Sequence, residues 1–132
     1  MEGINTILGA NMIGTLATLN EDGSPWATPV HIVAHGNYIY WFSKDTHQHS
    51  QNVIRDPRVC VSLWSKNEGT KGAYINSTTE RLEGENADAA FAMVKEKFGS
   101  LPPVFENTSP YRAKIGHINS SKSSENRWYF YS

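Results

Sequence analysis

The stretch YIYWFSKDTHQHSQNVIRDPRVCVSLW, residues 38–64, decides the fold of this chain. Its first part, YIYWF, carries a bulky aromatic or β-branched side chain at every position. Alternating side chains of a strand point to opposite faces, so such a run is typical of a strand that is covered on both sides. The sequence therefore predicts a strand over residues 38–42 that packs on two layers.

A helix and a second strand are predicted after this strand. The apolar run stops at a polar turn, in which Asp45 or Thr46 is suited to cap a helix. The helix is expected to cover residues 47–55, because the residue before Pro57 disfavours the α conformation. Apolar residues then alternate with Cys60 and Ser62, which predicts a strand that resumes the sheet.

The polar turn has the chemistry of an anion site. A helix N-terminus presents unpaired backbone N–H groups and a partial positive charge. Around it the sequence gathers a hydroxyl, an ammonium group and three further donors: Ser43, Lys44, His47, Gln48 and His49. These groups suit a phosphate monoester. The alternative is an ordinary capped helix with a solvated polar face.

The remaining chain reads as strands with two further helices. Alternation predicts strands over residues 12–19, 25–34, 73–84, 111–118 and 127–131. Apolar residues that share one helical face predict helices over residues 3–10 and 87–98. Asn86 is expected to cap the last helix and Gly99 to end it, while Pro29 is expected at a sheet edge or bulge. Together these elements predict a mainly β fold, a compact antiparallel barrel of six or seven strands with a few short helices.

Length and composition narrow the function classes. The chain has 132 residues and a net charge of −1, which predicts one domain over residues 1–132 and disfavours nucleic acid or an anionic membrane as a partner. Cys60 is the one cysteine, which indicates a reducing compartment and a buried, unreactive thiol. No signal peptide or long apolar run is evident, so we expect a cytoplasmic location.

Several kinds of catalytic or metal site lack their sequence signatures. His47 and His49 are two residues apart on a predicted helix and point to different faces, and His31, His35 and His117 are scattered. No glycine-rich phosphate loop and no nucleophile elbow occurs. We therefore expect no metal site and no obligatory catalytic side chain.

The order of these elements resembles a known family. The pattern IGTLATLNEDGSPWATPVHIV, then YIYWFSKDTHQHSQNVIRDPRVCVSLW, then ERLEG at residues 80–84 and a terminal strand with Trp128, is similar to the pyridoxamine 5'-phosphate oxidase-like, FMN-binding split barrels. The likeness extends over nearly the whole chain. It implies a six- to seven-stranded antiparallel split barrel, a homodimer, and FMN bound at the dimer interface.

The resemblance also implies which residues hold the flavin. The second strand, with Thr28, Pro29, Val30 and His31, would lie along the isoalloxazine ring and bind it through backbone groups. Phe42 and Ser43 would contact the ribityl chain and phosphate, together with Lys44, His47, Gln48 and His49 at the helix start. Trp128 would either pack on the flavin across the interface or fill the barrel.

This sequence departs from the family pattern at two places near the flavin. Many relatives carry a basic group where this chain has His47, Gln48 and His49, and a neutral imidazole supplies a donor but no fixed charge. The oxidase itself has a glutamine where this chain has Gly72, and the sequence ends at Ser132 without the segment that grips a pyridoxal-type substrate. We therefore expect an activity other than pyridoxamine phosphate oxidation.

The sequence thus predicts an FMN-dependent oxidoreductase whose substrate is a small molecule, with NAD(P)H as a conceivable electron donor. The alternative is a non-catalytic module on the same barrel that binds a flavin or haem or senses redox state. A deazaflavin is a third candidate cofactor, because sister families use it on this fold.

Overall fold

The computed structural model describes residues 12–65 and 70–132. The helix expected over residues 3–10 lies outside the described residues. The described elements are, in chain order, β1 (Met12–Leu19), β2 (Pro25–His35), β3 (Tyr38–Ser43), α2 (Gln48–Arg55), β4 (Arg58–Ser65), β5 (Lys71–Arg81), α3 (Gly84–Phe98), a 3₁₀ turn (Pro103–Phe105), β6 (Ser109–Lys114), β7 (His117–Ile118) and β8 (Arg127–Tyr131).

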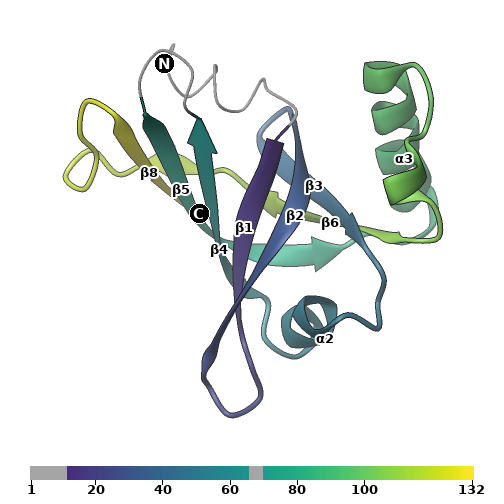
Figure 1. Cartoon of the computed structure of the whole chain (residues 1–132), viewed down its shortest axis with the longest axis horizontal. Helices are drawn as coiled ribbons and strands as arrows, with labels where there is room; N and C mark the ends of the chain where they lie inside the picture. Colours follow the sequence, from purple (N-terminus) through teal and green to yellow (C-terminus); the bar gives the residue numbers. More distant parts are fainter. Residues whose placement is uncertain (1–11, 66–69) are drawn as a thin grey trace.

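Six of these strands close into an antiparallel barrel. The strand order is β4-β1-β2-β3-β6-β5, and β5 pairs with β4 to complete the ring. The first three strands form a meander, and in the turn between β1 and β2 Gly23 adopts a left-handed φ of 85°. Figure 1 shows the barrel with α2 at its lower end and α3 on the side of β3 and β6.

The predicted mainly β barrel is confirmed, and two strands extend it. β8 lies beside β5 in parallel, outside the closed ring, and β7 pairs with β8. The strand predicted over residues 111–118 is two strands, because Gly116 breaks it with a left-handed φ of 78°. A Cβ at Gly116 would come within 2.1 Å of the Tyr131 carbonyl oxygen, so only glycine fits where the chain passes the end of β8.

The strand β3 is buried on both faces, as its sequence predicts. Ile39 and Trp41 face the barrel interior, where the Trp41 ring stacks on Tyr111 at 6.2 Å between centroids. Tyr40 and Phe42 face outward into a second apolar cluster formed with α3. Because β3 has side chains in both clusters, it connects the barrel core to α3. Burying one such large side chain contributes roughly 1.5–3 kcal/mol to the stability of the fold.

One stretch of β2 is left as an open sheet edge. β2 pairs with β1 over Pro25–Ile32 but pairs with β3 only from Val33 onward. Pro29 lies within the part that has no second strand partner in the described chain. The expectation that Pro29 marks an edge is therefore confirmed, and backbone groups along this stretch are available to a ligand.

Both helices begin differently from the sequence prediction. The N-cap of α2 is His47, which makes no side-chain capping hydrogen bond, so the proposed capping by Asp45 or Thr46 is wrong. Asp45 instead pairs with Arg81, a partner 36 positions away that the local pattern does not reveal. The last residue of α2 is Arg55, as predicted.

The last helix begins earlier than expected. α3 starts at Gly84 with Glu83 as its N-cap, so Asn86 lies within the first turn and is not the cap. The strand expected up to Gly84 ends at Arg81, because Gly84 adopts a left-handed φ of 55° that turns the chain directly into the helix. Gly99 ends α3 in the left-handed conformation, as predicted.

Candidate functional site

A cleft of about 500 Å³ opens between the free edge of β2, the end of β3, the start of α2 and the segment after α3. Most of the side chains that the sequence assigned to a ligand come together here. Those that line the cleft are Thr28, Pro29, Val30, His31, Phe42, Ser43, Lys44, His47 and His49. The volume lies in the range that protein cofactor sites occupy, roughly 300–1,000 Å³.

The opposite wall of the cleft is a segment that sequence reasoning did not place. It consists of the 3₁₀ turn and the residues after it, and its cleft-lining members are Pro103, Val104, Glu106, Asn107 and Thr108. Phe105 anchors this segment, because its ring packs on Phe42 at 4.8 Å and meets the His31 ring edge-on at 6.5 Å. The Pro102-Pro103 pair gave a local signal of stiffness, but nothing in the sequence showed which strands the segment faces.

Ser43 and His49 form a buried pair at the polar end of the cleft, where β3 ends and α2 begins. The His49 Nε2 atom lies 2.8 Å from the Ser43 Oγ atom, and both residues are more than nine-tenths buried. Burial lowers the pKa of His49, and the neighbouring His47 lowers it further. At neutral pH His49 is therefore an uncharged imidazole, and it orients the Ser43 hydroxyl at the cleft surface.

The positive charge at the polar end of the cleft comes from Lys44. It is the one lysine or arginine side chain among the described residues that line the cleft, and it is exposed. His47 is also exposed and stands beside His49, with 5.5 Å between the ring centroids. We refer to Ser43, Lys44, His47 and His49, together with the backbone that leads into α2, as the anion corner.

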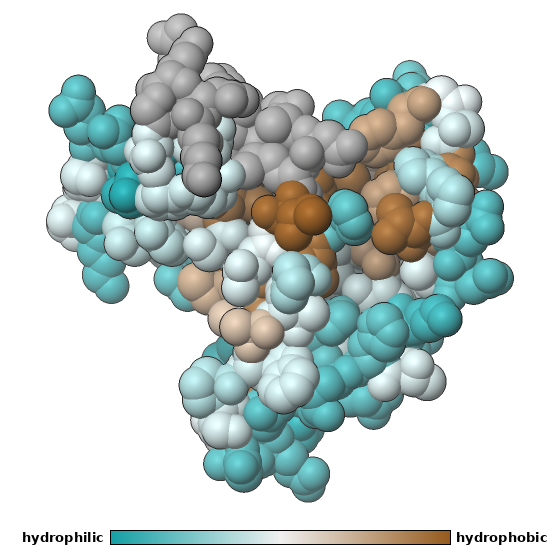
Figure 2. Space-filling view, in the orientation of Figure 1, coloured by the Kyte–Doolittle hydropathy of each residue, from teal (hydrophilic) through white to brown (hydrophobic). Residues whose placement is uncertain are grey.

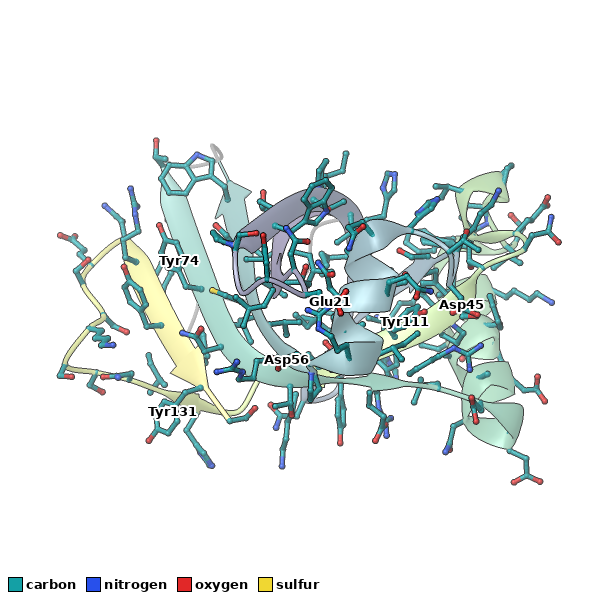
Figure 3. All side chains as sticks on the ribbon, turned by 90° about the horizontal axis from the view of Figure 1, so that it is seen from below. Glu21, Asp45, Asp56, Tyr74, Tyr111 and Tyr131 are labelled. Carbon is teal, nitrogen blue, oxygen red and sulfur yellow. The ribbon has the colours of Figure 1, made fainter. Side chains whose placement is uncertain are left out.

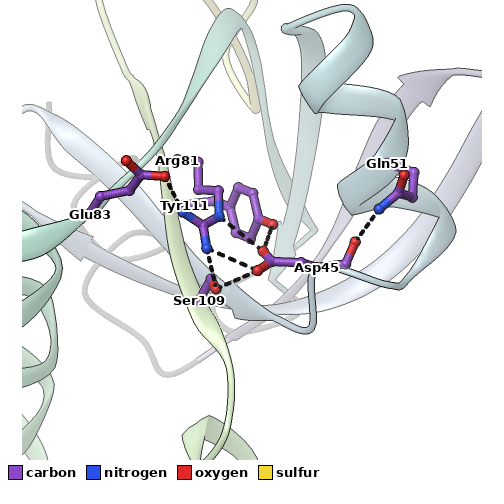
Figure 4. A network of polar contacts seen from close by, with 6 residues as sticks. All are labelled: Asp45, Gln51, Arg81, Glu83, Ser109 and Tyr111. Carbon is purple, nitrogen blue, oxygen red and sulfur yellow. Dashed lines mark hydrogen bonds and ion pairs between the residues drawn. The ribbon is translucent and has the colours of Figure 1, made fainter.

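A network of polar contacts holds the turn behind the anion corner (Figure 4). The Arg81 guanidinium donates to both carboxylate oxygens of Asp45, with Nε–Oδ1 at 3.0 Å and Nη2–Oδ2 at 2.9 Å. Ser109 Oγ donates to Oδ2 at 3.0 Å, and the Tyr111 hydroxyl donates to Oδ1. Hydrogen bonds from Arg81 lower the pKa of Asp45 far below its usual range, so the carboxylate stays charged.

A second set of contacts fixes the helix that begins at the anion corner. Asn52 on α2 is fully buried, and its Nδ2 donates at 3.0 Å to both Thr18 Oγ1 and Asn20 Oδ1. Arg55 donates to the Leu19 carbonyl oxygen from the next turn of the helix. These bonds tie α2 to the β1–β2 hairpin, so the position of the anion corner depends on the barrel.

The other two predicted residues, Gln48 and Trp128, do not line the cleft of their own chain. Gln48 donates to Asn52 Oδ1 at 2.8 Å and so supports the helix. Trp128 lies on β8, opposite Ala73 of β5, and packs against the barrel core. Its contact with a flavin across an interface stays a prediction.

The described residues also bear on three other features, a metal site, a reactive thiol and a membrane-spanning helix. Within the described residues, no group of three or more His, Cys, Asp or Glu side chains is arranged to hold a metal ion. Burial raises the pKa of the half-buried Cys60 thiol, which keeps it protonated and unreactive. Within residues 12–65 and 70–132, no helix has the length and apolar character needed to span a bilayer.

The family model described as pyridoxamine 5'-phosphate oxidase matches residues 1–121. The chain belongs to the pyridoxamine 5'-phosphate oxidase-like family. Among curated proteins, none matches the sequence significantly. The resemblance drawn from the residue pattern is therefore confirmed at the level of the family.

Solved structures share the family's split-barrel fold. A haem storage protein from Vibrio cholerae superimposes with a TM-score of 0.73 at 15% identity, covering 88% of this chain and 89% of its own. An F420 reductase gives a TM-score of 0.68 at 14% identity, covering 86% and 93%. A FAD-binding protein from Mesorhizobium loti gives 0.66 at 20% identity, covering 86% and 87%. At these identities the likeness establishes the fold alone.

Proposed function

We propose that this protein is a flavoprotein oxidoreductase that binds FMN in the cleft between β2 and the anion corner. The observation that carries the proposal is the convergence of an open strand edge and a polar helix start on one cleft of suitable size. A tricyclic ring with a phosphate tail needs both features, a flat partly apolar wall with backbone partners and a separate anion site. In this proposal residues 1–132 form a single FMN-binding split-barrel domain.

The ring would lie along the free edge of β2. Thr28, Pro29, Val30 and His31 supply this edge, and Val104 on the opposite wall adds apolar surface. Backbone groups of β2 that face away from β1 have no strand partner in the described chain, so they can bond the polar rim of the ring. Pro29 lacks an N–H group and leaves a gap in that row of donors.

The phosphate would occupy the anion corner. Lys44 offers a full positive charge, Ser43 offers a hydroxyl oriented by His49, and the start of α2 offers backbone N–H groups. The phosphate monoester of FMN is a dianion near neutral pH, which these groups complement. Phe42 lies between the two halves and would pack along the ribityl chain.

A second copy of the chain would complete the site. The open cleft leaves one face of a bound ring uncovered. The sheet beside it has an outer face with no charged side chain between Arg58 at the start of β4 and Arg127 at the start of β8. This outer sheet face is formed by outward residues of β1, β4, β5 and β8 that oppose one another in register; they are Ile13, Thr15, Ala17, Cys60, Ser62, Trp64, Tyr74, Asn76, Tyr129 and Tyr131.

The composition of the outer sheet face supports a homodimer. Four of its members are aromatic, and Ile13 is 60% exposed. The Arg127 guanidinium caps one end, 4.2 Å from the Trp64 ring centroid. Figure 2 shows pale and brown residues over the middle of the molecule with teal residues around them, and Figure 3 shows Tyr74 and Tyr131 at the end opposite Asp45. Aromatic-rich faces with an uncharged middle are typical of subunit interfaces.

Bound FMN would supply hydride or single-electron transfer, and the protein would bind and orient it and exclude water. The residues present favour a reaction other than pyridoxamine phosphate oxidation. By the family resemblance, Gly72 occupies the place of the oxidase's glutamine. A Cβ at Gly72 would come within 2.8 Å of two carbon atoms of the Trp64 ring. A larger side chain would have to displace Trp64, so this chain lacks room for the oxidase's residue.

The first test of the proposal is absorbance spectroscopy and FMN titration of the purified protein. We expect a yellow protein whose released cofactor is FMN, with a dissociation constant of about 10 µM or tighter for protein refilled with FMN. The Lys44→Ala variant should bind FMN about tenfold more weakly, because it loses the fixed charge at the anion corner. A colourless protein that takes up no FMN at about 50 µM contradicts the proposal.

A second candidate is a haem-binding module on the same barrel. Two exposed imidazoles, those of His31 and His47, line the cleft from β2 and from the α2 start. A neutral imidazole is a common axial ligand of haem iron. A Soret band in the purified protein that is lost in His31→Ala or His47→Ala would favour this candidate, whereas steady NAD(P)H turnover with added FMN would favour the enzyme.

A further inference from the structure

The proposed FMN site does not explain the presence of the Asp45 carboxylate. It is next to Lys44 in the sequence, and a carboxylate beside a phosphate site repels the phosphate. Ser43, Lys44 and His47 all line the cleft, but Asp45 does not. Its side chain extends from the other side of the turn, toward β5 and β6 (Figure 4).

The contacts of Asp45 connect the turn to three elements of the fold. Arg81 comes from β5, and Ser109 and Tyr111 come from β6. From α2, the Gln51 Nε2 atom donates to the Asp45 carbonyl oxygen at 2.6 Å. Both carboxylate oxygens and the backbone carbonyl are thus bonded, which leaves the turn little freedom to move relative to the barrel.

We infer that Asp45 is a positioning residue, which holds the anion corner in the orientation that receives the cofactor's phosphate. The inference rests on the proposed FMN site and adds a residue that does not touch the ligand. By fixing the turn on the barrel side, Asp45 presents Lys44 and the backbone before α2 to the cleft. Without the Arg81 pair, these groups would have to be ordered at the moment of binding, which weakens affinity.

The positioning role and a direct charge effect predict opposite results. If the Asp45 carboxylate acted on the phosphate only through space, its removal would strengthen FMN binding. If it acts through the turn, its removal weakens FMN binding and leaves riboflavin binding unchanged, because riboflavin has no phosphate. The comparison of FMN with riboflavin therefore isolates the anion corner from the rest of the cleft.

The experiment titrates FMN and riboflavin into wild type and Asp45→Asn, following flavin fluorescence. Because a hydrogen bond to a charged group is worth about a factor of ten, we expect the FMN dissociation constant to rise about tenfold in Asp45→Asn and that of riboflavin less than about twofold. Asp56→Asn is the matched control, since Asp56 lies at the other end of α2 and pairs with exposed Arg58. It should change neither constant.

Two further variants keep the test decisive if Asp45→Asn does not fold. Arg81→Lys preserves every charge but loses the two-pronged contact with Asp45, so weaker FMN binding in this variant reports geometry alone. Ser109→Ala removes one bond to Asp45 and should weaken FMN binding about threefold. Riboflavin binding shows in each case that the cleft is intact.

The results separate this inference from the proposed function. Wild type that binds FMN no more tightly than riboflavin overturns the proposed phosphate site itself. Wild type that prefers FMN, with an equal preference in Asp45→Asn and Arg81→Lys, overturns the positioning role and leaves the FMN site standing. Tighter FMN binding by Asp45→Asn, or equal weakening of both flavins, also overturns the positioning role.

Discussion

His49 couples the protonation of the anion corner to the stability of the fold. Its ring is 5% exposed and is bonded to Ser43, and burial lowers its pKa from the ordinary 6.5. In the unfolded chain the same imidazole takes up a proton near its ordinary pKa. As pH falls below 6.5, the unfolded state therefore binds more protons than the folded state, and the free energy of unfolding decreases.

This coupling predicts a pH dependence of stability that a single substitution reduces. The urea concentration at the unfolding midpoint of wild type should be lower at about pH 5 than at about pH 7.5. His49→Gln should show a smaller decrease, because the amide can bond Ser43 without taking up a proton. His47→Gln is the control, since His47 is exposed and should leave most of the dependence in place. An equal fall in wild type and His49→Gln would exclude His49 as its source.

At the scale of the element, α2 owes its position to Asn52. The helix has eight residues, too short to be stable by itself, and Asn52 anchors it to Thr18 and Asn20 of the hairpin. Asn52→Ala would leave the buried Thr18 hydroxyl without this partner and should lower the free energy of unfolding by about 2 kcal/mol in urea denaturation. FMN affinity should fall with it, because α2 begins at the anion corner.

The control for this prediction lies two residues further along the same helix. Ile54 is 58% exposed, so Ile54→Ala should change the free energy of unfolding by less than about 0.5 kcal/mol. If the two variants destabilise the protein equally, the loss in Asn52→Ala does not come from the bonds to the hairpin.

The elements differ in how much of them the sequence predicted. β1, β2, β4 and β8 follow from alternation, because each has one face in the core, and β3 follows from its unbroken bulky run, because both of its faces are covered. The capping predicted for α2 was wrong because Asp45 has a strong partner far away in sequence, which overrides local capping. The start of α3 was wrong because Gly84 turns the chain into the helix earlier than expected. The same limit hid the cleft wall at 103–108, since a loop carries no periodicity that shows which strands it meets.

Some residues of the candidate site could likewise be predicted from the sequence, and others could not. Ser43, Lys44, His47 and His49 could be assigned from residue types at a helix start, and the cleft does bring them together. Arg81, Ser109 and Tyr111 could not, because each looks like an ordinary strand residue until the β3–β6 and β5–β6 pairings bring them to the turn. Contacts between strands distant in sequence supply what local chemistry does not.

At the scale of the whole molecule, the outer sheet face predicts the oligomeric state. Ile13→Glu adds a charge at an exposed position on this face, so it should shift the protein from dimer to monomer in light scattering at micromolar concentration without unfolding it. FMN affinity should fall together with the dimer, because in the proposed dimer the second copy would cover the ring.

Ile54→Glu is the control for the dimer prediction as well. Ile54 is similarly exposed, at 58% against 60% for Ile13, but it lies on α2 outside the outer sheet face. This variant should remain dimeric. Wild type that is monomeric at high concentration would contradict the predicted interface.

The open stretch of β2 has a consequence for the protein in storage and during synthesis. An exposed strand edge is a template onto which another chain can add a strand, which is how β proteins begin to aggregate. Pro29 sits in the middle of this stretch and cannot donate a backbone hydrogen bond, so it interrupts any ladder that an intruding chain would build. Pro29, on the proposed cofactor edge, thus also protects the cofactor-free protein against aggregation.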